Sequence, residues 1–319
     1  MIWKSHHSFA DGLSSMAMNL QLDEKYDIEK LLPFKPIGLW QRIAIRAMVP
    51  LYLPLILWES YLRRKDRNPL HDGRRKLTGE KKVAISKEFD FLTIKMASKS
   101  LGVTINEMLI GALSTAISRL FKEKGDEKSK RIRIAMPCNI RWKYYNTYDE
   151  VELENKFAPM PLKIDLTDEP KTALKLASRI SREMKRNFTK VYALYFLSLV
   201  TSYFTPMFML KIGAEKVSKP FTMAFSNTPG VLRKIHYKDV ETLGMTSSFI
   251  CSGRCAMAIA LLSYAEQIQF SVTLDSCINE DPKVIRKRFE ESIEEMIELA
   301  QAIETGQAED DLHKNGKSE

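Results

Sequence analysis

Apolar residues recur every three or four positions in several stretches of the chain, which predicts helices with one buried face. Leu13, Met16 and Leu20 show this spacing near the start of the chain. The same pattern, bounded by Gly102, Gly125 or a proline, predicts further helices. The predicted helices are 12–20, 90–101, 104–124, 170–188 and 282–300.

Other segments alternate between apolar and polar residues or are short and wholly apolar, which is typical of strands. Ile268, Phe270, Val272 and Leu274 show the clearest alternation. The predicted strands are 1–7, 131–136, 157–164, 221–225, 247–251, 256–264 and 268–274. Strands that alternate with helices in this order predict a layered α/β protein with a mixed sheet.

Two segments are more apolar than is usual for a protein surface that faces water. Residues 37–58 are rich in Ile, Leu and Trp, but Pro50 and Pro54 interrupt them. Residues 191–210 lack charge for 20 positions, although serines, threonines and Pro206 weaken the pattern. A spanning helix needs about 20 apolar residues. We therefore expect both segments to be interfacial or re-entrant elements.

The charge balance favours an anionic partner, because 49 basic residues stand against 40 acidic ones. Residues 63–82 carry nine Lys or Arg and three Asp or Glu, directly after the first apolar segment. Such a basic stretch is attracted by anionic lipid headgroups, although a solvated linker is the alternative. The chain has none of the helix-turn-helix, zinc-finger or aromatic RNA-binding patterns, so we expect no nucleic acid partner.

The four cysteines, at positions 138, 251, 255 and 277, include no CxxC pair. Histidines and cysteines with zinc-finger spacing are also missing, so we predict no metal site. Unpaired cysteines suit a reducing compartment.

The sharpest chemical pattern is His6-His7-Ser8-Phe9-Ala10-Asp11-Gly12. An imidazole is suited to remove a hydroxyl proton near neutral pH when its other nitrogen fixes the tautomer. Asp11 can lock the turn that presents the histidine, and Gly12 allows a backbone bend where a Cβ would clash. The alternative is a pair of hydrogen-bonded histidines at the end of a strand.

This HHxxxDG pattern resembles the signature of the CoA-dependent acyltransferase superfamily, which includes chloramphenicol acetyltransferase and peptide-synthetase condensation domains. The resemblance implies that His7 is the general base, with His6 beside it. It also implies that Asp11 holds the loop through an ion pair, with a partner that can lie in an N-terminal segment of the family.

Further motifs narrow the resemblance to wax ester synthase/diacylglycerol acyltransferases. Asn106-Glu107 resembles the Asn-Asp helix motif of that family, and Arg141 the arginine of its Pro-x-x-x-Arg strand end. Glu154-Asn155 resembles a Gly-Asn step that has lost its glycine, and Ser226-Asn227-Thr228-Pro229-Gly230 resembles its SNVPGP element. These motifs follow one another in the family order over roughly residues 1–300.

Each secondary motif also has a simpler interpretation. Glu107 completes a helix capping box with Thr104, and Arg141 could belong to an ordinary structural ion pair. Residues 226–230 could be only a turn. If the motifs act together, Asn106, Ser226 and Asn227 are the polar candidates to stabilise an oxyanion.

The resemblance implies a two-lobe fold similar to chloramphenicol acetyltransferase, with an incomplete first lobe. We expect a remnant of that lobe in 1–82, the C-terminal acyltransferase lobe in 83–303 and a disordered tail in 304–319. The implied reaction transfers a fatty acyl group from acyl-CoA to a long-chain alcohol or diacylglycerol. It needs no cofactor beyond this co-substrate.

The implied substrates are apolar, so we expect monotopic attachment to the endoplasmic reticulum or plasma membrane, with the site facing the cytosol. A crossing at either apolar segment would separate residues that must share one site. Two other functions stay open. One is a non-catalytic, lipid-binding relative that has lost most of the first lobe, and the other is acyl transfer to an amine or a small alcohol.

Overall fold

The computed structural model describes residues 2–23, 38–58, 66–72, 74–141, 148–186, 188–231, 233–238, 240–250 and 253–315. Within this part of the chain, seven strands form one mixed sheet in the order β1-β9-β8-β5-β3-β4, with β2 also paired to β9. The strands are β1 (Lys81–Ile85), β2 (Phe89–Asp90), β3 (Arg131–Asn139), β4 (Phe157–Asp165), β5 (Met223–Thr228), β8 (Met257–Tyr264) and β9 (Gln267–Asp275).

The centre of the sheet is parallel and its edges are antiparallel. Strand β5 runs parallel to both β3 and β8, whereas the β3–β4, β8–β9 and β1–β9 pairs are antiparallel. Strand β8 is buried at almost every position, as expected for a strand covered on both faces. The mixed sheet predicted from the order of elements is confirmed.

Four helices pack together against the sheet: α3 (Phe91–Ser100), α4 (Ile105–Glu123), α5 (Pro170–Arg186) and α8 (Pro282–Asn315). Helix α4 is buried along most of its length between α5 and α8. Phe289 of α8 packs against Phe270 of β9, with ring centroids 4.7 Å apart, and against Phe225 of β5 at 6.4 Å. This aromatic cluster joins the helical layer to the middle of the sheet.

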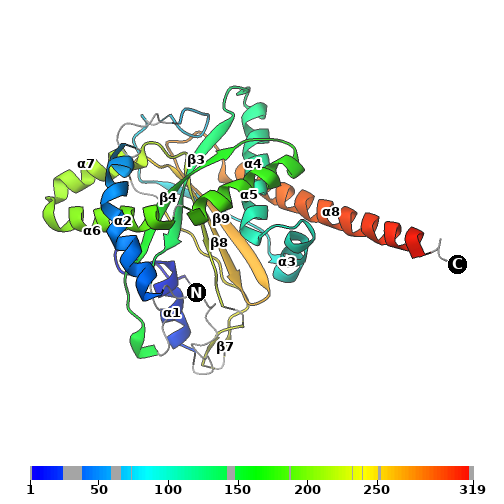
Figure 1. The fold of residues 1–319 in the computed structure, drawn as a ribbon, viewed down its shortest axis with the longest axis horizontal. Coiled ribbons are helices and arrows are strands. Elements are labelled where there is room, and N and C mark those ends of the chain that lie inside the picture. The colour runs from blue at the N-terminus through cyan, green and yellow to red at the C-terminus, as the bar shows by residue number, and fades with distance from the viewer. Residues whose placement is uncertain are drawn as a thin grey trace.

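A second group of helices lies on the other side of the molecule, away from the projecting end of α8 (Figure 1). Helix α2 (Leu39–Leu57) packs along α6 (Phe188–Phe204), and α7 (Met207–Ser218) follows α6. Helix α1 (Gly12–Gln21) directly follows the two histidines. The small elements η3 (Tyr148–Glu150), β6 (His236–Tyr237) and β7 (Val240–Glu241) complete the described chain.

Two predicted strands are not formed. Residues 2–7 adopt no regular element. Residues 247–250 run beside β9 without joining its ladder, because the contacts there use side chains: Ser271 Oγ donates to the Ser247 carbonyl, and Ser248 Oγ lies 2.9 Å from Thr273 Oγ1. Residue 251 of that prediction lies outside the described residues.

The two apolar segments are more helical than predicted. Pro50 and Pro54 both lie inside α2, one turn apart and exposed, so the hydrogen bonds that they cannot donate are missing from a single side of the helix. The 191–210 run is divided between α6 and α7 at Pro206. Of the helices in the described part of the chain, none alone has the length and apolar character to cross a membrane, while α3 and α4 together, bent by 88°, do.

The predicted tail and the predicted basic linker also differ from expectation. Helix α8 continues to Asn315, past residue 304 where we predicted a disordered tail, and no proline interrupts it. One part of the predicted linker, 66–72, is packed rather than solvated, whereas most of 74–80 is exposed, as predicted. Asp66 accepts from Arg133 Nη1 at 2.6 Å, and Leu70 and His71 are buried.

Candidate active site

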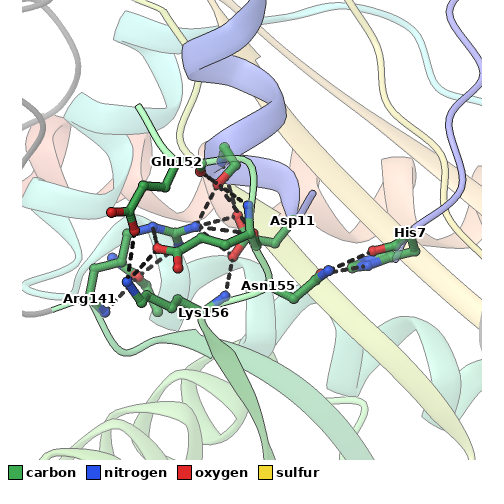
Figure 2. Close-up of polar contacts among 9 residues, drawn as sticks. His7, Asp11, Arg141, Glu152, Asn155 and Lys156 are labelled. Carbon is green, nitrogen blue, oxygen red and sulfur yellow. Dashed lines mark hydrogen bonds and ion pairs between the residues drawn. The ribbon is translucent and has the colours of Figure 1, made fainter. Parts of the chain in front are cut away.

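Asp11 is the buried anchor of the loop that carries the histidines. Both of its carboxylate oxygens lie 2.9 Å from Arg141 Nη2, just after strand β3 (Figure 2). The backbone N–H of Ser14 donates to Asp11 Oδ1 at 3.0 Å, which caps helix α1, and the N–H of Lys156 donates to Oδ2 at 2.9 Å. The ion-pair partner of Asp11 therefore lies in this chain, and it is the arginine of the predicted strand-end motif.

The anchor is reinforced by the segment before strand β4. Arg141 Nη2 also donates to Ser14 Oγ at 2.7 Å, and the N–H of Asp11 donates to the Glu154 carbonyl at 3.1 Å. Lys156 Nζ pairs with Glu154 at 2.7 Å and with Glu152 at 3.2 Å. Desolvation lowers the pKa of the Lys156 ammonium, but the hydrogen bonds to these two glutamates outweigh it and raise that pKa. These contacts hold together the histidine loop, the chain just after β3 and the segment before β4.

His7 lies at the exposed end of the same loop and is held by a single side chain. His7 Nδ1 lies 3.0 Å from Asn155 Oδ1, and Asn155 Nδ2 donates to the His7 carbonyl at 2.8 Å (Figure 2). Because the amide nitrogen serves the carbonyl, the oxygen that faces the ring can only accept. In the neutral ring, Nδ1 is therefore the protonated nitrogen and Nε2 the one with the lone pair. The ring also packs against Phe157, with centroids 5.5 Å apart.

Among the described residues, His6 forms hydrogen bonds only with Ser8. Its Nδ1 accepts from the Ser8 N–H at 3.2 Å and lies 2.7 Å from Ser8 Oγ. Of the two histidines, His7 is therefore the one that a distant segment of the chain orients.

Gly12 is required for a reason other than the predicted bend. It is not one of the described glycines with positive φ. A Cβ added to Gly12 would lie 3.2 Å from Thr228 Oγ1 at the end of β5, which is tighter than ordinary contact. Gly12 thus lets the histidine loop approach the predicted 226–230 element closely.

That element also contacts the start of helix α4. Asn227 Nδ2 donates to Asn106 Oδ1 at 2.6 Å. Ser226 lies in strand β5, paired with Ala260 of β8. Glu107 is engaged in the predicted capping box, where its Oε2 accepts from the Thr104 N–H at 2.7 Å.

The structure links the three predicted motifs in a chain of contacts, from the histidine loop through Thr228 to Asn227 and Asn106. In the described part of the chain, His7 forms no hydrogen bond to Asn106 or Asn227. An open pocket of about 710 Å³ lies elsewhere, at the starts of β1 and α8. Sequence reasoning missed the role of Asn155, and its place in the degenerate Gly-Asn step was the available signal.

Comparison with known proteins places these features in context. Residues 155–297 match the family model described as the WS/DGAT C-terminal domain. The chain is 23% identical over 330 residues to wax ester synthase/diacylglycerol acyltransferase 11 of Arabidopsis thaliana, an alignment that covers 88% of this chain and 66% of that protein. It is 21% identical over 220 residues to an O-acyltransferase WSD of Acinetobacter baylyi, covering 68% and 46% respectively.

Solved structures agree on the fold. A wax ester synthase/diacylglycerol acyltransferase from Marinobacter aquaeolei VT8 superposes with a TM-score of 0.59 at 17% identity, covering 93% of this chain and 66% of that one. The epimerization domain of tyrocidine synthetase B gives a TM-score of 0.57 at 12% identity, covering 93% and 68%. The predicted fold class is confirmed, and the chain spans about two thirds of the length of these proteins or less.

Proposed function

The chain belongs to the wax ester synthase/diacylglycerol acyltransferase family, and from this premise we propose that it is an acyl-CoA-dependent O-acyltransferase. Its acceptor is a long-chain alcohol or diacylglycerol, and its product a wax ester or triacylglycerol. The observation that carries the proposal is the orientation of His7: Asn155 holds the Nδ1–H at 3.0 Å, which leaves Nε2 available as a base.

In the proposed reaction His7 Nε2 removes the proton of the acceptor hydroxyl as its oxygen attacks the thioester carbonyl. The tetrahedral adduct collapses by breaking the C–S bond, and the departing thiolate takes the proton from the imidazolium to leave as CoA. The enzyme returns to its starting protonation state without a covalent intermediate. Such general-base assistance is typically worth about 10²- to 10⁴-fold in rate.

The negative charge that develops on the carbonyl oxygen needs preorganised donors. Asn106 is the preferred candidate, because its Oδ1 accepts from Asn227 and its own Nδ2 is thereby directed away from that bond. Ser226 lies next to Asn227 on the same strand end. We propose that Asn106 donates to the oxyanion and that Asn227 orients Asn106, whereas Ser226, the preceding residue of β5, points to the opposite face of the sheet.

The proposed substrates reside in membranes, and we propose monotopic attachment with the site facing the cytosol, at the endoplasmic reticulum or plasma membrane. The contacts Gly12–Thr228 and Asn227–Asn106 support one continuous site built from segments that flank both apolar runs. Proteolysis of sealed vesicles tests the topology. Selective protection of 80–185, with both ends cleaved, would contradict it.

Substitution of the base is the direct test of the activity. His7→Ala is expected to reduce ester formation from labelled acyl-CoA and hexadecanol or diacylglycerol by about 10²- to 10⁴-fold. Its thermal unfolding should match the wild type, because the His7 side chain is exposed. His6→Ala is the matched control and should retain most activity.

Two outcomes would overturn the proposal. Full turnover by His7→Ala would remove the base. A correctly folded wild-type protein that binds acyl-CoA or lipid but forms no ester with either acceptor would instead identify a non-catalytic lipid-binding relative.

A further inference from the structure

Helix α6 begins inside the protein and ends outside it. Val191, Tyr192 and Ala193 are buried, and the Tyr192 hydroxyl donates to the Ile140 carbonyl at 2.5 Å, one residue before Arg141. Along the helix the exposure rises, until Tyr203 is 79% and Phe204 85% exposed. The residues stay uncharged and mostly apolar as the helix leaves the core, where a helix facing water would carry charged side chains.

Helix α7 continues this surface beyond Pro206. None of its residues is buried, and Met207, Phe208, Met209 and Ile212 are exposed. Its other end is held to the body of the protein, because Glu215 accepts from Arg254 Nη2 at 3.1 Å and Ser218 Oγ accepts from the Arg254 N–H at 2.8 Å. The corner between α6 and α7 is thus a fixed projection, as Figure 1 shows at the left.

Helix α2 lies beside α6 and widens the surface. Its buried residues Ile45 and Val49 are one turn apart, and Val49 packs against Ala193 of α6. Trp40, Leu51 and Trp58 remain exposed. Tryptophan is enriched where proteins meet the membrane–water boundary, because its ring is apolar and its N–H is polar.

The hydroxyl groups on the outer half of α6 do not depend on water. Ser198 Oγ donates to the Tyr195 carbonyl at 2.7 Å, and Ser202 Oγ to the Leu199 carbonyl at 2.7 Å. Thr201 Oγ1 donates to the Leu197 carbonyl at 2.8 Å. These polar side chains are satisfied by their own helix, which is the arrangement that an apolar surrounding requires.

The charges on these helices have one dominant sign. The basic residues are Arg42, Arg46, Lys190, Lys211 and Lys216. The single acidic residue, Glu215, already pairs with Arg254. Basic side chains at the border of an apolar surface match the phosphates of anionic lipids.

We propose that the outer sides of α2, α6 and α7 form a docking surface for an anionic bilayer, with the α6–α7 corner inserted at the level of the headgroups. Tyr203, Phe204, Met207 and Phe208 supply the inserted apolar contact, and Lys211 and Lys216 face lipid phosphates. This surface would make the membrane attachment proposed above, and the docking proposal does not depend on a catalytic role of His7.

A second copy of the chain suits this surface less well. In a two-fold dimer the same patch meets itself, so the surface that carries Lys211 and Lys216 would meet a surface of the same charge. The patch offers no acidic side chain besides Glu215 to balance them, among the described residues of these helices. A lipid surface supplies the missing negative charge.

The test is co-sedimentation of the full chain with vesicles of phosphatidylcholine alone or with one quarter phosphatidylglycerol. Wild-type protein is expected to bind the anionic vesicles more strongly. Phe204→Ser/Phe208→Ser should lower the partition coefficient on both by at least tenfold. Lys211→Glu/Lys216→Glu should lower it on the anionic vesicles only.

The matched control is Val240→Ser/Leu243→Ser, which removes two exposed apolar side chains near β7, away from α7 (Figure 1). Unchanged binding by the Phe204/Phe208 variant, or an equal loss in the control, would overturn the proposal. So would a wild-type dimer in gel filtration that this variant splits while vesicle binding persists.

Turnover with substrates dispersed in detergent micelles separates docking from catalysis. The Phe204/Phe208 variant should keep wild-type turnover there. If the wild type binds vesicles through this surface but forms no ester in micelles, the docking surface stands and the proposed enzyme activity fails.

Discussion

The two ends of the HHxxxDG segment differ sharply in their surroundings. Asp11 is buried and contacts Arg141, Ser14 and the backbone of Lys156. His7, four residues earlier, is exposed and rests on Asn155 and Phe157. Within one short motif, one end is fixed from several directions and the other is fixed from one side only.

This contrast assigns different tasks to the two ends. A buried ion pair with several additional hydrogen bonds fixes a loop, but its charge is fully engaged and unavailable to a substrate. An exposed imidazole with one oriented nitrogen keeps the other nitrogen accessible. We therefore expect substitutions at the Asp11 end to change stability and those at the His7 end to change rate.

The largest expected effect is on folding. Asp11→Ala removes the buried carboxylate that both pairs with the Arg141 guanidinium and caps helix α1, which should lower the free energy of unfolding by about 3–5 kcal/mol. Urea unfolding followed by circular dichroism measures it. The matched control is Arg131→Ala in strand β3, which ends just before Arg141. The ion pair of Arg131 with Asp165 is largely exposed, so a loss of at most about 1 kcal/mol is expected. Equal losses would refute the distinction.

Asn155→Ala tests the other end. It should leave stability nearly unchanged and reduce turnover about two- to tenfold, the equivalent of one hydrogen bond of about 0.5–1.5 kcal/mol. Adding Asn155→Ala to His7→Ala should cause no further loss, because Asn155 acts through the ring. An additive loss in steady-state rates would mean that Asn155 has a separate role.

The smallest expected effect is on the pH dependence of stability, through the buried His71. Burial lowers the pKa of the His71 imidazole, although the Lys219 carbonyl and nearby Asp66 and Asp72 oppose this. The unfolded chain therefore takes up a proton that the folded protein resists. The stability that depends on neutral His71 is fully present above about pH 6.5 and is lost as the pH falls below it toward the lower, folded-state pKa.

His71→Gln keeps a donor for the Lys219 carbonyl, to which His71 Nε2 is bonded at 2.7 Å, but does not titrate. Its free energy of unfolding should decline less than that of the wild type between about pH 7 and pH 5. A slope for His71→Gln equal to that of the wild type would contradict this assignment.

The sequence predicted the helices and the central strands well, because their apolar periodicity reflects burial directly. It also predicted Arg141 as part of the site, but not that this residue pairs with Asp11, since 130 positions separate them. The Glu154-Asn155 step marked the position of Asn155, but its role was missed because the sequence does not show that its amide contacts His7, 148 positions away. Helix α2 contradicted the rule that proline ends helices, because its prolines share one exposed side.

Two adjacent residues just before β4, Asn155 and Lys156, contact opposite ends of the histidine loop. The Asn155 side chain is hydrogen-bonded to His7, and the Lys156 backbone N–H donates to Asp11. A displacement of this segment would move both contacts together. The spacing between His7 and Asp11 therefore depends on two residues joined by one peptide bond. Inserting one residue between 155 and 156 should leave each contact chemically intact yet throw the imidazole out of register.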